Sequence, residues 1–245
     1  MSNSDNINEF NELNELNEFN DFSKKSPIII NIEGNIGVGK STLTNLIKNR
    51  IKDSHVVDEP IDIWLNTKDN NGSHILDNFY NDKNRWSYTF QNFAYISRVM
   101  KIEETIKNSN FNKIFLDRSI ETDLYVFSKM LLDEGCMNSL EYKIYNYWNE
   151  FYYKYVRKQY LQRTIYLRAT PQTCFERIAK RGRESEKLIS IDYLEKLHKY
   201  HDDWLLKADN VLIIHYDDAN DHQNIELDID YQNKIIGKIE DFIKQ

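Results

Sequence analysis

The sequence has few cysteines, no excess of positive charge and no long hydrophobic run, and each absence excludes a class of protein. Its 245 residues include two cysteines, Cys136 and Cys174, which lie too far apart for a metal-binding or redox motif. We expect buried thiols in a reducing compartment rather than a disulfide. The net charge of −7 argues against a general nucleic-acid-binding protein, whose surface would be basic.

No apolar segment approaches the length needed to cross a membrane, and no secretory leader with a charged and then an apolar part is present. We therefore expect a cytoplasmic protein without a membrane partner. The proportions of hydrophobic residues, 40%, and charged residues, 29%, are ordinary for a globular protein. The chain is long enough for one domain with a substantial core.

Residues 1–26 differ in composition from the rest, because Asn, Glu and Phe or Leu recur every three residues. This period drifts around a helix of about 3.6 residues per turn, so the apolar positions form no continuous stripe. We expect a low-complexity leader that is disordered or transiently helical. A mitochondrial targeting peptide is the alternative, but such peptides are rich in arginine and poor in acidic residues. Residues 27–245 are expected to form a single domain.

A glycine-rich segment between a strand-like run, residues 28–32, and a helix-like run, residues 42–51, matches a phosphate-binding P-loop. Its glycines let successive backbone N–H groups point inward, and the start of the helix adds partial positive charge. Lys40 would contact the β- and γ-phosphates, and the Ser41 hydroxyl would bind Mg²⁺. The pattern predicts that a nucleoside triphosphate binds here. The residues expected around its phosphates are Gly34, Asn35, Ile36, Gly37, Val38, Gly39, Lys40, Ser41 and Thr42.

Strand-like and helix-like segments alternate along the rest of the chain. Further strands are expected at residues 55–57, 113–116, 163–168 and 211–215, and helices at 75–107 with a break near 81–85, and at 123–160, 171–181 and 231–244. This alternation predicts a three-layer α/β fold, with helices on both faces of a five-stranded parallel sheet. Ligands bind beyond the carboxyl ends of such strands, where the P-loop, Glu59 and Asp117 are all expected.

Three charged residues at strand ends are candidates for the chemistry. Glu59, which precedes Pro60, could accept a proton from an attacking hydroxyl, or it could be a solvated turn residue or a partner in a helix N-cap. Asp117 resembles the acidic residue that holds Mg²⁺ in P-loop proteins. Arg118 could contact a phosphate or the attacking oxygen, and a structural salt bridge is the alternative. Spacing alone leaves these alternatives open.

An arginine-rich segment follows the helix expected at residues 171–181. Arg177 and Arg181 are one helical turn apart and share a face, with Arg183 and Glu186 beyond them. Such a charged run is usually a solvated surface, but in a P-loop protein it favours a lid that excludes water from the phosphoryl group. The aromatic residues that could either contact a ligand or belong to the core are Trp64, Tyr80, Phe90 and Phe127.

Taken in order, these motifs resemble those of the deoxyribonucleoside kinases, in particular the deoxycytidine and deoxyguanosine kinase branch. The resemblance covers about residues 27–204, and motifs in the family's order are much more specific than any one alone. Its segments are Glu33-Gly-Asn-Ile-Gly-Val-Gly-Lys-Ser-Thr42, Glu59-Pro-Ile-Asp-Ile-Trp64, Arg85-Trp-Ser-Tyr-Thr-Phe-Gln91, Asp117-Arg-Ser119, Cys136-Met-Asn138, Arg177-x-x-x-Arg181-Gly-Arg183 and Tyr193-Leu-Glu-Lys-Leu-His198. The resemblance implies transfer of the γ-phosphate of ATP to the 5′-hydroxyl of a deoxyribonucleoside, with Mg²⁺, in nucleotide salvage. We further expect a homodimer.

By the same resemblance, Glu59 is expected to deprotonate the 5′-hydroxyl and Arg118 to contact that oxygen. Tyr80 and Glu186 would bind the 3′-hydroxyl, and Gln91 would read the edge of the base through its amide. The side chains expected around the base are Trp64, Phe90 and Phe127, and the arginines expected in the lid are Arg177 and Arg181. Asp117 stands where the deoxycytidine kinase branch has Glu, so we expect this shorter acid to hold Mg²⁺ through water.

Base preference is predicted from Arg98 and Asp123. Arg98 lies two helical turns after Gln91, on the same face, and by the resemblance it meets Asp123 at the far wall of the base pocket. Such a pair offers donors to a ring nitrogen or O6 and an acceptor to an exocyclic amine, whereas thymine would present a methyl group. We predict a purine substrate first, deoxyguanosine or deoxyadenosine, then deoxycytidine, with thymidine poor. The alternative is a structural ion pair outside the pocket.

Two other functions are weighed against this one. A nucleoside monophosphate kinase would need extra cations for the acceptor phosphate, where this chain offers Glu59 and Gln91. A non-catalytic P-loop switch would need an Asn-Lys-x-Asp motif to read the base, and the sequence has none. Deoxycytidine as the main substrate is the nearest alternative.

Overall fold

The computed structural model describes residues 26–183, 186–217 and 228–245, so residues 1–25 of the predicted leader lie outside the described residues. The described chain contains a sheet of β1 (Ile28–Glu33), β2 (Ser54–Val57), β3 (Lys113–Asp117), β4 (Gln162–Arg168) and β5 (Val211–His215). The strand order is β2-β3-β1-β4-β5, and each pairing is parallel. The predicted five-stranded parallel sheet is confirmed, with every strand end within one residue of its expected place.

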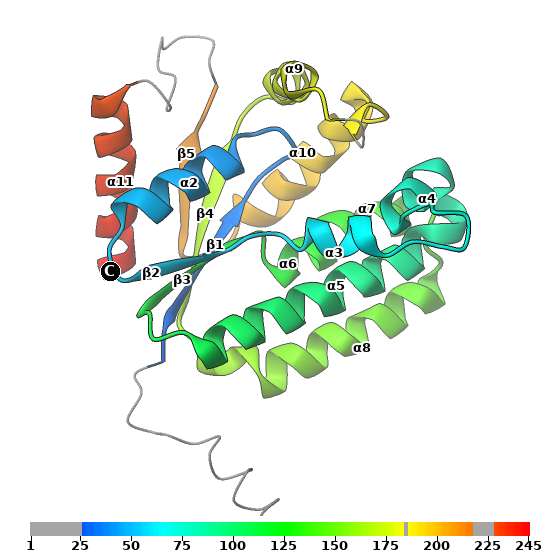
Figure 1. Ribbon diagram of the computed structural model, residues 1–245, viewed down its shortest axis with the longest axis horizontal. Coiled ribbons are helices and arrows are strands. Elements are labelled where there is room, and N and C mark those ends of the chain that lie inside the picture. The colour runs from blue at the N-terminus through cyan, green and yellow to red at the C-terminus, as the bar shows by residue number, and fades with distance from the viewer. Residues whose placement is uncertain (1–25, 184–185, 218–227) are drawn as a thin grey trace, which may run out of the picture.

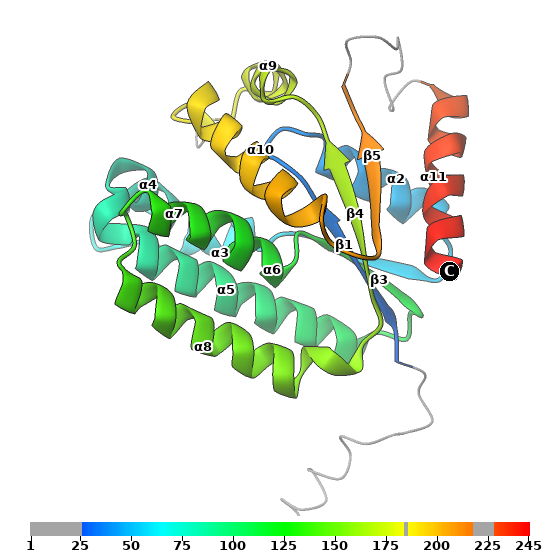
Figure 2. The same cartoon turned by 180° about the vertical axis from the view of Figure 1, so that it is seen from behind.

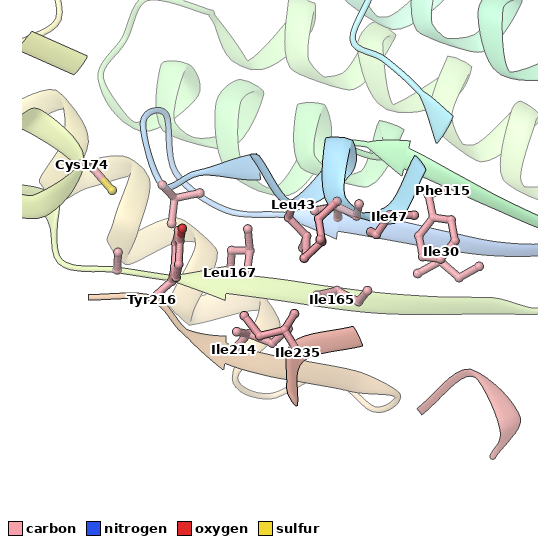
Figure 3. Packing of buried hydrophobic residues seen from close by; sticks show 14 of the residues in the cluster. Ile30, Leu43, Ile47, Phe115, Ile165, Leu167, Cys174, Ile214, Tyr216 and Ile235 are labelled. Carbon is pink, nitrogen blue, oxygen red and sulfur yellow. The ribbon is translucent and has the colours of Figure 1, made fainter. Parts of the chain in front are cut away.

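Helices cover both faces of this sheet (Figures 1 and 2). On one face, α2 (Lys40–Arg50) and α11 (Ile229–Lys244) contribute Ile47 and Ile235 to the buried cluster that contains Ile30 of β1 (Figure 3). On the other face, Ile102 of α5 (Lys83–Asn108) belongs to the cluster that contains Ile29. Successive residues of β1 thus point into opposite layers, as the two-residue period of a strand requires. The three-layer α/β fold is confirmed.

The central strand β1 fixes where the site can form. Its residues Ile32 and Glu33 lie opposite Asp117 of β3 and Tyr166 of β4, respectively. The connections after β1 and β3 therefore start side by side, at the point where the strand order changes direction. The P-loop and the Asp117–Arg118 segment are neighbours for this reason.

The remaining helices differ from the sequence prediction in two places. The helical region predicted at 123–160 is divided into several helices, because the chain turns at Gly135, which has a φ of +75°, and a new helix starts after Asn138. The Asn138 side chain caps that helix by accepting the Glu141 N–H. Two helices, α3 and α10, were not predicted.

The bounds of the remaining helices are α3 (Ile61–Asn66), α4 (Ile75–Asn81), α6 (Ile120–Thr122), the π-helix η1 (Asp123–Ser128), α7 (Lys129–Asp133), α8 (Ser139–Tyr155), the 3₁₀-helix η2 (Arg157–Gln159), α9 (Pro171–Arg181) and α10 (Ile191–Leu205).

Within the described ranges, no helix combines the length and the apolar composition that crossing a bilayer requires.

Candidate active site

A cavity of about 1230 Å³ lies between the P-loop, the ends of β2 and β3, α5, η1 and the segment after α9. Single-ligand sites usually measure about 300–1,000 Å³, so this volume suits two ligands side by side. The structure brings the predicted catalytic, metal and substrate residues together here, although their roles stay predictions. The predicted residues that line the cavity are Ile36, Gly37, Gly39, Lys40, Ser41, Thr42, Glu59, Trp64, Tyr80, Phe90, Gln91, Arg98, Asp117, Arg118, Asp123, Phe127, Arg177, Arg181 and Glu186.

The P-loop depends on glycine where it turns between β1 and α2. Gly34 and Gly39 have φ values of +144° and +109°, in the region that side chains disfavour. A Cβ atom at Gly34 would lie 2.5 Å from the Leu167 carbonyl oxygen, and one at Gly39 would lie 2.5 Å from the Tyr216 ring. Neither position could hold a larger residue without moving the loop.

Two predicted P-loop residues use their side chains for structure. The Asn35 amide donates to the Leu194 carbonyl of α10, at 2.9 Å. The Val38 side chain is fully buried in the core. Neither residue lines the cavity, so their side chains serve the loop and its packing rather than direct contact with a ligand.

Glu59 is buried and held by two arginines. Its carboxylate accepts hydrogen bonds from Arg118 Nη1 at 3.0 Å and from Arg98 Nη2 at 2.9 Å. The side chain is 12% exposed, which excludes a solvated turn residue. Burial raises the pKa of Glu59, but the two guanidiniums outweigh it and bring the pKa to about 2. Glu59 is therefore ionised throughout the physiological range.

Arg98 continues this chain of charges towards the side of the cavity where a base is predicted to bind. Its Nε donates to Asp123 Oδ2 at 3.0 Å, and both side chains are almost fully buried. Burial raises the pKa of Asp123, and Arg98 opposes this effect. The ion pair lines the cavity rather than lying outside it.

Arg118 has a left-handed backbone, with a φ of +69°, which is unusual for a residue with a side chain. Such strain costs about 1–3 kcal/mol and needs support from its surroundings. The Arg118 N–H donates to the Ile32 carbonyl at 3.1 Å, and Nη2 donates to the Gly34 carbonyl at 3.3 Å. Its guanidinium lies 5.4 Å from the centre of the Phe127 ring.

Glu33 supplies further support that the sequence reasoning missed. It is fully buried and accepts the Ser119 N–H at 2.9 Å together with the Thr122 hydroxyl. Burial raises its pKa, whereas these two hydrogen bonds lower it. Glu33 thus ties the residue before the P-loop to the residue after Arg118. The sequence did contain a signal for this role, because an acidic residue ends an otherwise apolar strand directly before the first glycine of the P-loop.

Asp117 and Ser41 fit a site for Mg²⁺. Asp117 Oδ1 is buried and has no hydrogen-bond partner in the part of the chain that the structure describes. Burial raises the pKa of this carboxyl group, while the Lys40 ammonium lowers it. The Ser41 hydroxyl belongs to the same cavity. One acidic and one hydroxyl oxygen suit Mg²⁺, which keeps several waters and otherwise binds phosphate oxygens.

The side of the cavity where a base is predicted to bind is walled by aromatic rings that also belong to a buried cluster. Trp64 donates its indole N–H to Ser97 Oγ at 2.9 Å, and its ring lies edge-on to Phe90 at 5.4 Å. Phe90 stacks on Phe79 at 4.8 Å. These aromatics are both core and cavity wall, which the sequence had offered as alternatives. Sequence reasoning missed the lining residues Leu76, Phe79, Tyr193 and Tyr216.

The arginines of the predicted lid already have partners. Arg177, on α9, donates to the Val38 carbonyl at 2.7 Å and lies over the Tyr216 ring at 4.5 Å. Arg181 pairs with Glu186, with a shortest distance of 2.6 Å. Helices α9 and α10 pack together near the P-loop (Figure 1). To reach a phosphate, Arg181 would have to exchange its carboxylate partner for the ligand.

A parallel sheet with a P-loop after its central strand, beside an ionised carboxylate and an arginine, defines a P-loop kinase. The family model for deoxynucleoside kinases matches residues 30–244, and the chain belongs to this family. The predicted family and enzyme class are confirmed, and the class implies use of ATP.

Named relatives show the same similarity. The chain is 35% identical over 236 residues to deoxycytidine kinase of Homo sapiens, covering 87% of this chain and 90% of the relative. It is 35% identical over 193 residues to mitochondrial deoxyguanosine kinase of Xenopus laevis, covering 73% of each. It is 33% identical over 217 residues to a probable deoxycytidine kinase of fowlpox virus, covering 88% of each. The predicted location in the cytoplasm stays a prediction.

The lowered pKa of Lys40 predicts how ATP use depends on pH. Its ammonium donates to the Gly34 and Asn35 carbonyls at 3.0 and 3.1 Å, and burial followed by Arg118 lowers its pKa to about 8. Lys40 is charged below this pH and neutral above it, so attraction for phosphate is lost as pH rises. We expect kcat/KM for ATP to fall about tenfold between pH 7 and pH 9, measured at constant ionic strength.

Arginine stays charged over this pH range. In the Lys40→Arg variant, kcat/KM for ATP should therefore no longer fall between pH 7 and pH 9, although its absolute value is lower. A profile of the unmodified enzyme that is flat to pH 9.5 would contradict the assignment.

Proposed function

We propose that this enzyme transfers the γ-phosphate of ATP to the 5′-hydroxyl of a deoxyribonucleoside, with a purine deoxynucleoside as its preferred acceptor. The observation that carries the proposal is the buried chain of charges Asp123–Arg98–Glu59–Arg118 along one cavity wall. One end lies at the P-loop, because Arg118 bonds to Gly34. The other end lies beside the aromatic walls, where a base would stack.

In this proposal Glu59 accepts a hydrogen bond from the 5′-hydroxyl. With a pKa of about 2 it is a weak base, so its main contribution is to orient the nucleophile. Phosphoryl transfer suits this arrangement, because its loose transition state needs little early proton removal. Glu59 then takes the proton as the new O–P bond forms. Arg118 is placed to stabilise the negative charge on the transferring group.

Other residues would hold the reactants in place. Burial raises the pKa of Tyr80 to about 12, so its hydroxyl stays protonated and can donate to the 3′-hydroxyl, with Glu186 as the acceptor. Ser41 and Asp117 would hold Mg²⁺. This ion, when bound, neutralises charge on the β- and γ-phosphates.

Glu59→Gln tests the catalytic carboxylate. The amide keeps the shape but cannot take the proton, and it loses the charge that pairs with both arginines. We expect kcat to fall about 10²-fold or more, with a much smaller change in KM for the nucleoside. Steady-state kinetics with ADP release as the readout measures both.

The matched control is Asp58→Asn. Asp58 is the neighbouring carboxylate, but it pairs with Lys48 at 2.8 Å and is half exposed, outside the cavity. Its substitution should leave kcat within about twofold of the unmodified enzyme. Near-normal kcat in a folded Glu59→Gln protein would remove Glu59 from the mechanism.

The partners of Arg98 and Asp123 support poor use of thymidine, which is the part of the base preference that this wall decides. Their charges are paired with each other and are removed from water, so a thymine methyl group would meet ionic groups without giving them a hydrogen bond. Adenine, guanine and cytosine each present a polar group instead. Pairing of both arginines, Arg98 and Arg118, with carboxylates also disfavours a nucleoside monophosphate, whose phosphate would need unneutralised cations.

The double substitution Arg98→Met with Asp123→Ala tests this wall. Because Arg98 also bonds to Glu59, we expect a lower kcat with every acceptor, so the ratio of substrates is the informative quantity. The ratio of kcat/KM for thymidine to that for deoxyadenosine should rise at least about tenfold. If the unmodified enzyme phosphorylates thymidine as well as deoxyadenosine or deoxyguanosine, the proposed pocket is wrong. A preference for deoxycytidine over both purines would favour the nearest alternative.

We also propose that the enzyme is a homodimer. Apolar side chains more than 40% exposed recur along α8, at Leu140, Ile144, Tyr147, Trp148, Phe151 and Tyr155. A stripe of this kind on a soluble monomer usually marks a protein contact. Light scattering should give twice the chain mass of 29.4 kDa, and Trp148→Glu with Phe151→Glu should give the single mass. A monomer at micromolar concentration for the unmodified chain would contradict the dimer.

A further inference from the structure

The helical turn that carries Asp123 and Phe127 is a π-helix, η1. At its end the Lys129 N–H is shared between the Val126 carbonyl and the Leu124 carbonyl, and the latter, five residues earlier, is the partner typical of a π-helix. In an α-helix, residues three and four apart share a face. The wider turn brings residues four and five apart onto one face instead. Ser128 therefore lies on the same side as Asp123 and Phe127.

Ser128 contacts the side chain that is expected to read the base. It is fully buried, and its hydroxyl donates to Gln91 Oε1 at 3.4 Å. Gln91 is 2% exposed and lines the cavity. In the described parts of the chain, Ser128 supplies the one hydrogen bond that reaches the Gln91 amide.

Tyr145 lies beside this contact. Its hydroxyl is buried and makes no hydrogen bond within the described residues. Burial raises the pKa of Tyr145 well above its usual value, and the nearby Ser128 and Asn149 side chains oppose this effect. Ser128 and Gln91 are therefore enclosed by the protein rather than by solvent.

The orientation of a glutamine amide decides what it recognises. Its oxygen accepts and its nitrogen donates, and the two are nearly the same shape, so a half-turn exchanges them at little steric cost. An amide that turns freely suits either order of donor and acceptor on a base. A hydroxyl that bonds to the oxygen favours one order.

We infer that Ser128 is a positioning residue that holds the Gln91 amide in one orientation and so selects bases by the order of their hydrogen-bonding groups. The inference rests on the proposed function, because it assumes that Gln91 meets the base. It adds a second element of selectivity to the Arg98–Asp123 wall, and both are carried by the same π-helical turn.

Deoxyadenosine and deoxyinosine form the sharpest pair of probes. They have nearly the same shape, but adenine presents an amine donor beside the N1 acceptor, whereas hypoxanthine presents the O6 acceptor beside the N1–H donor. An oriented amide discriminates between them, and a rotating one does not. The measurement is kcat/KM for each nucleoside at saturating ATP, with the unmodified enzyme and with Ser128→Ala.

We expect the unmodified enzyme to prefer one of the two nucleosides clearly. In Ser128→Ala their ratio should move towards one by about three- to tenfold, the effect of one neutral hydrogen bond. Ser128→Cys keeps the size but donates weakly, so its ratio should be intermediate. A general loss of packing would lower both values of kcat/KM together and leave the ratio unchanged.

Ser87→Ala is the matched control. Ser87 is also fully buried, but its hydroxyl donates to the Lys83 carbonyl within α5 and not to Gln91. Its substitution should leave the ratio within twofold of the unmodified enzyme. Thermal melting of each variant checks that it is folded.

Three results would overturn the inference: a ratio near one in the unmodified enzyme, an unchanged ratio in Ser128→Ala, or an equal change in Ser87→Ala. In each case phosphorylation of deoxynucleosides would still stand. Absence of phosphorylation with every deoxynucleoside is a different result, which would overturn the proposed function and this inference with it.

Discussion

The site depends on four charges that alternate in sign and are almost wholly removed from water. Asp123, Arg98, Glu59 and Arg118 each have an opposite charge within about 3 Å. Removing one partner from such a group leaves a buried charge uncompensated, which costs about 3–5 kcal/mol. The segment after β2, helix α5, the segment after β3 and η1 must therefore meet in one geometry. The proposed base wall and the proposed catalytic carboxylate, Glu59, are joined through Arg98, so a substitution that alters one is expected to alter the other.

The sheet supplies the rigid part of this arrangement. β1 and β3 are neighbours, so the P-loop and the Arg118 segment leave the sheet side by side. Glu33 then ties the two together through Ser119 and Thr122, and this holds the left-handed backbone of Arg118. A strained residue next to the chemistry is tolerated where its surroundings over-determine it. Here the fully buried carboxylate of Glu33 constrains the backbone next to Arg118.

The proposed lid is held by weaker contacts than the sheet. Arg181 and Glu186 are paired at a partly exposed position, where an ion pair is worth less than about 1 kcal/mol. If this segment is a lid, a triphosphate would compete with Glu186 for Arg181 at little cost. Closure of the proposed lid would then be an exchange of partners rather than the capture of a free arginine. Arg177, which bonds to the Val38 carbonyl, links the lid to the P-loop.

Local patterns in the sequence determined the strands, the P-loop and the strand-end positions of Glu59 and Asp117, because period and turn chemistry depend on near neighbours. The pairing of Arg98 with Asp123 was predicted from the family resemblance and not from a local pattern. The helical region predicted at 123–160 is interrupted near Gly135, where the chain turns, and Asn138 then caps the next helix. No residue in the sequence marks the π-helical turn η1. Whether a backbone N–H bonds to the carbonyl four or five residues earlier depends on the side chains that pack around the helix. Only the tertiary structure placed Ser128 against Gln91 and Glu33 against Thr122, since these pairs are far apart in the chain. Contacts between distant residues depend on how all the elements pack together, and no local period encodes that.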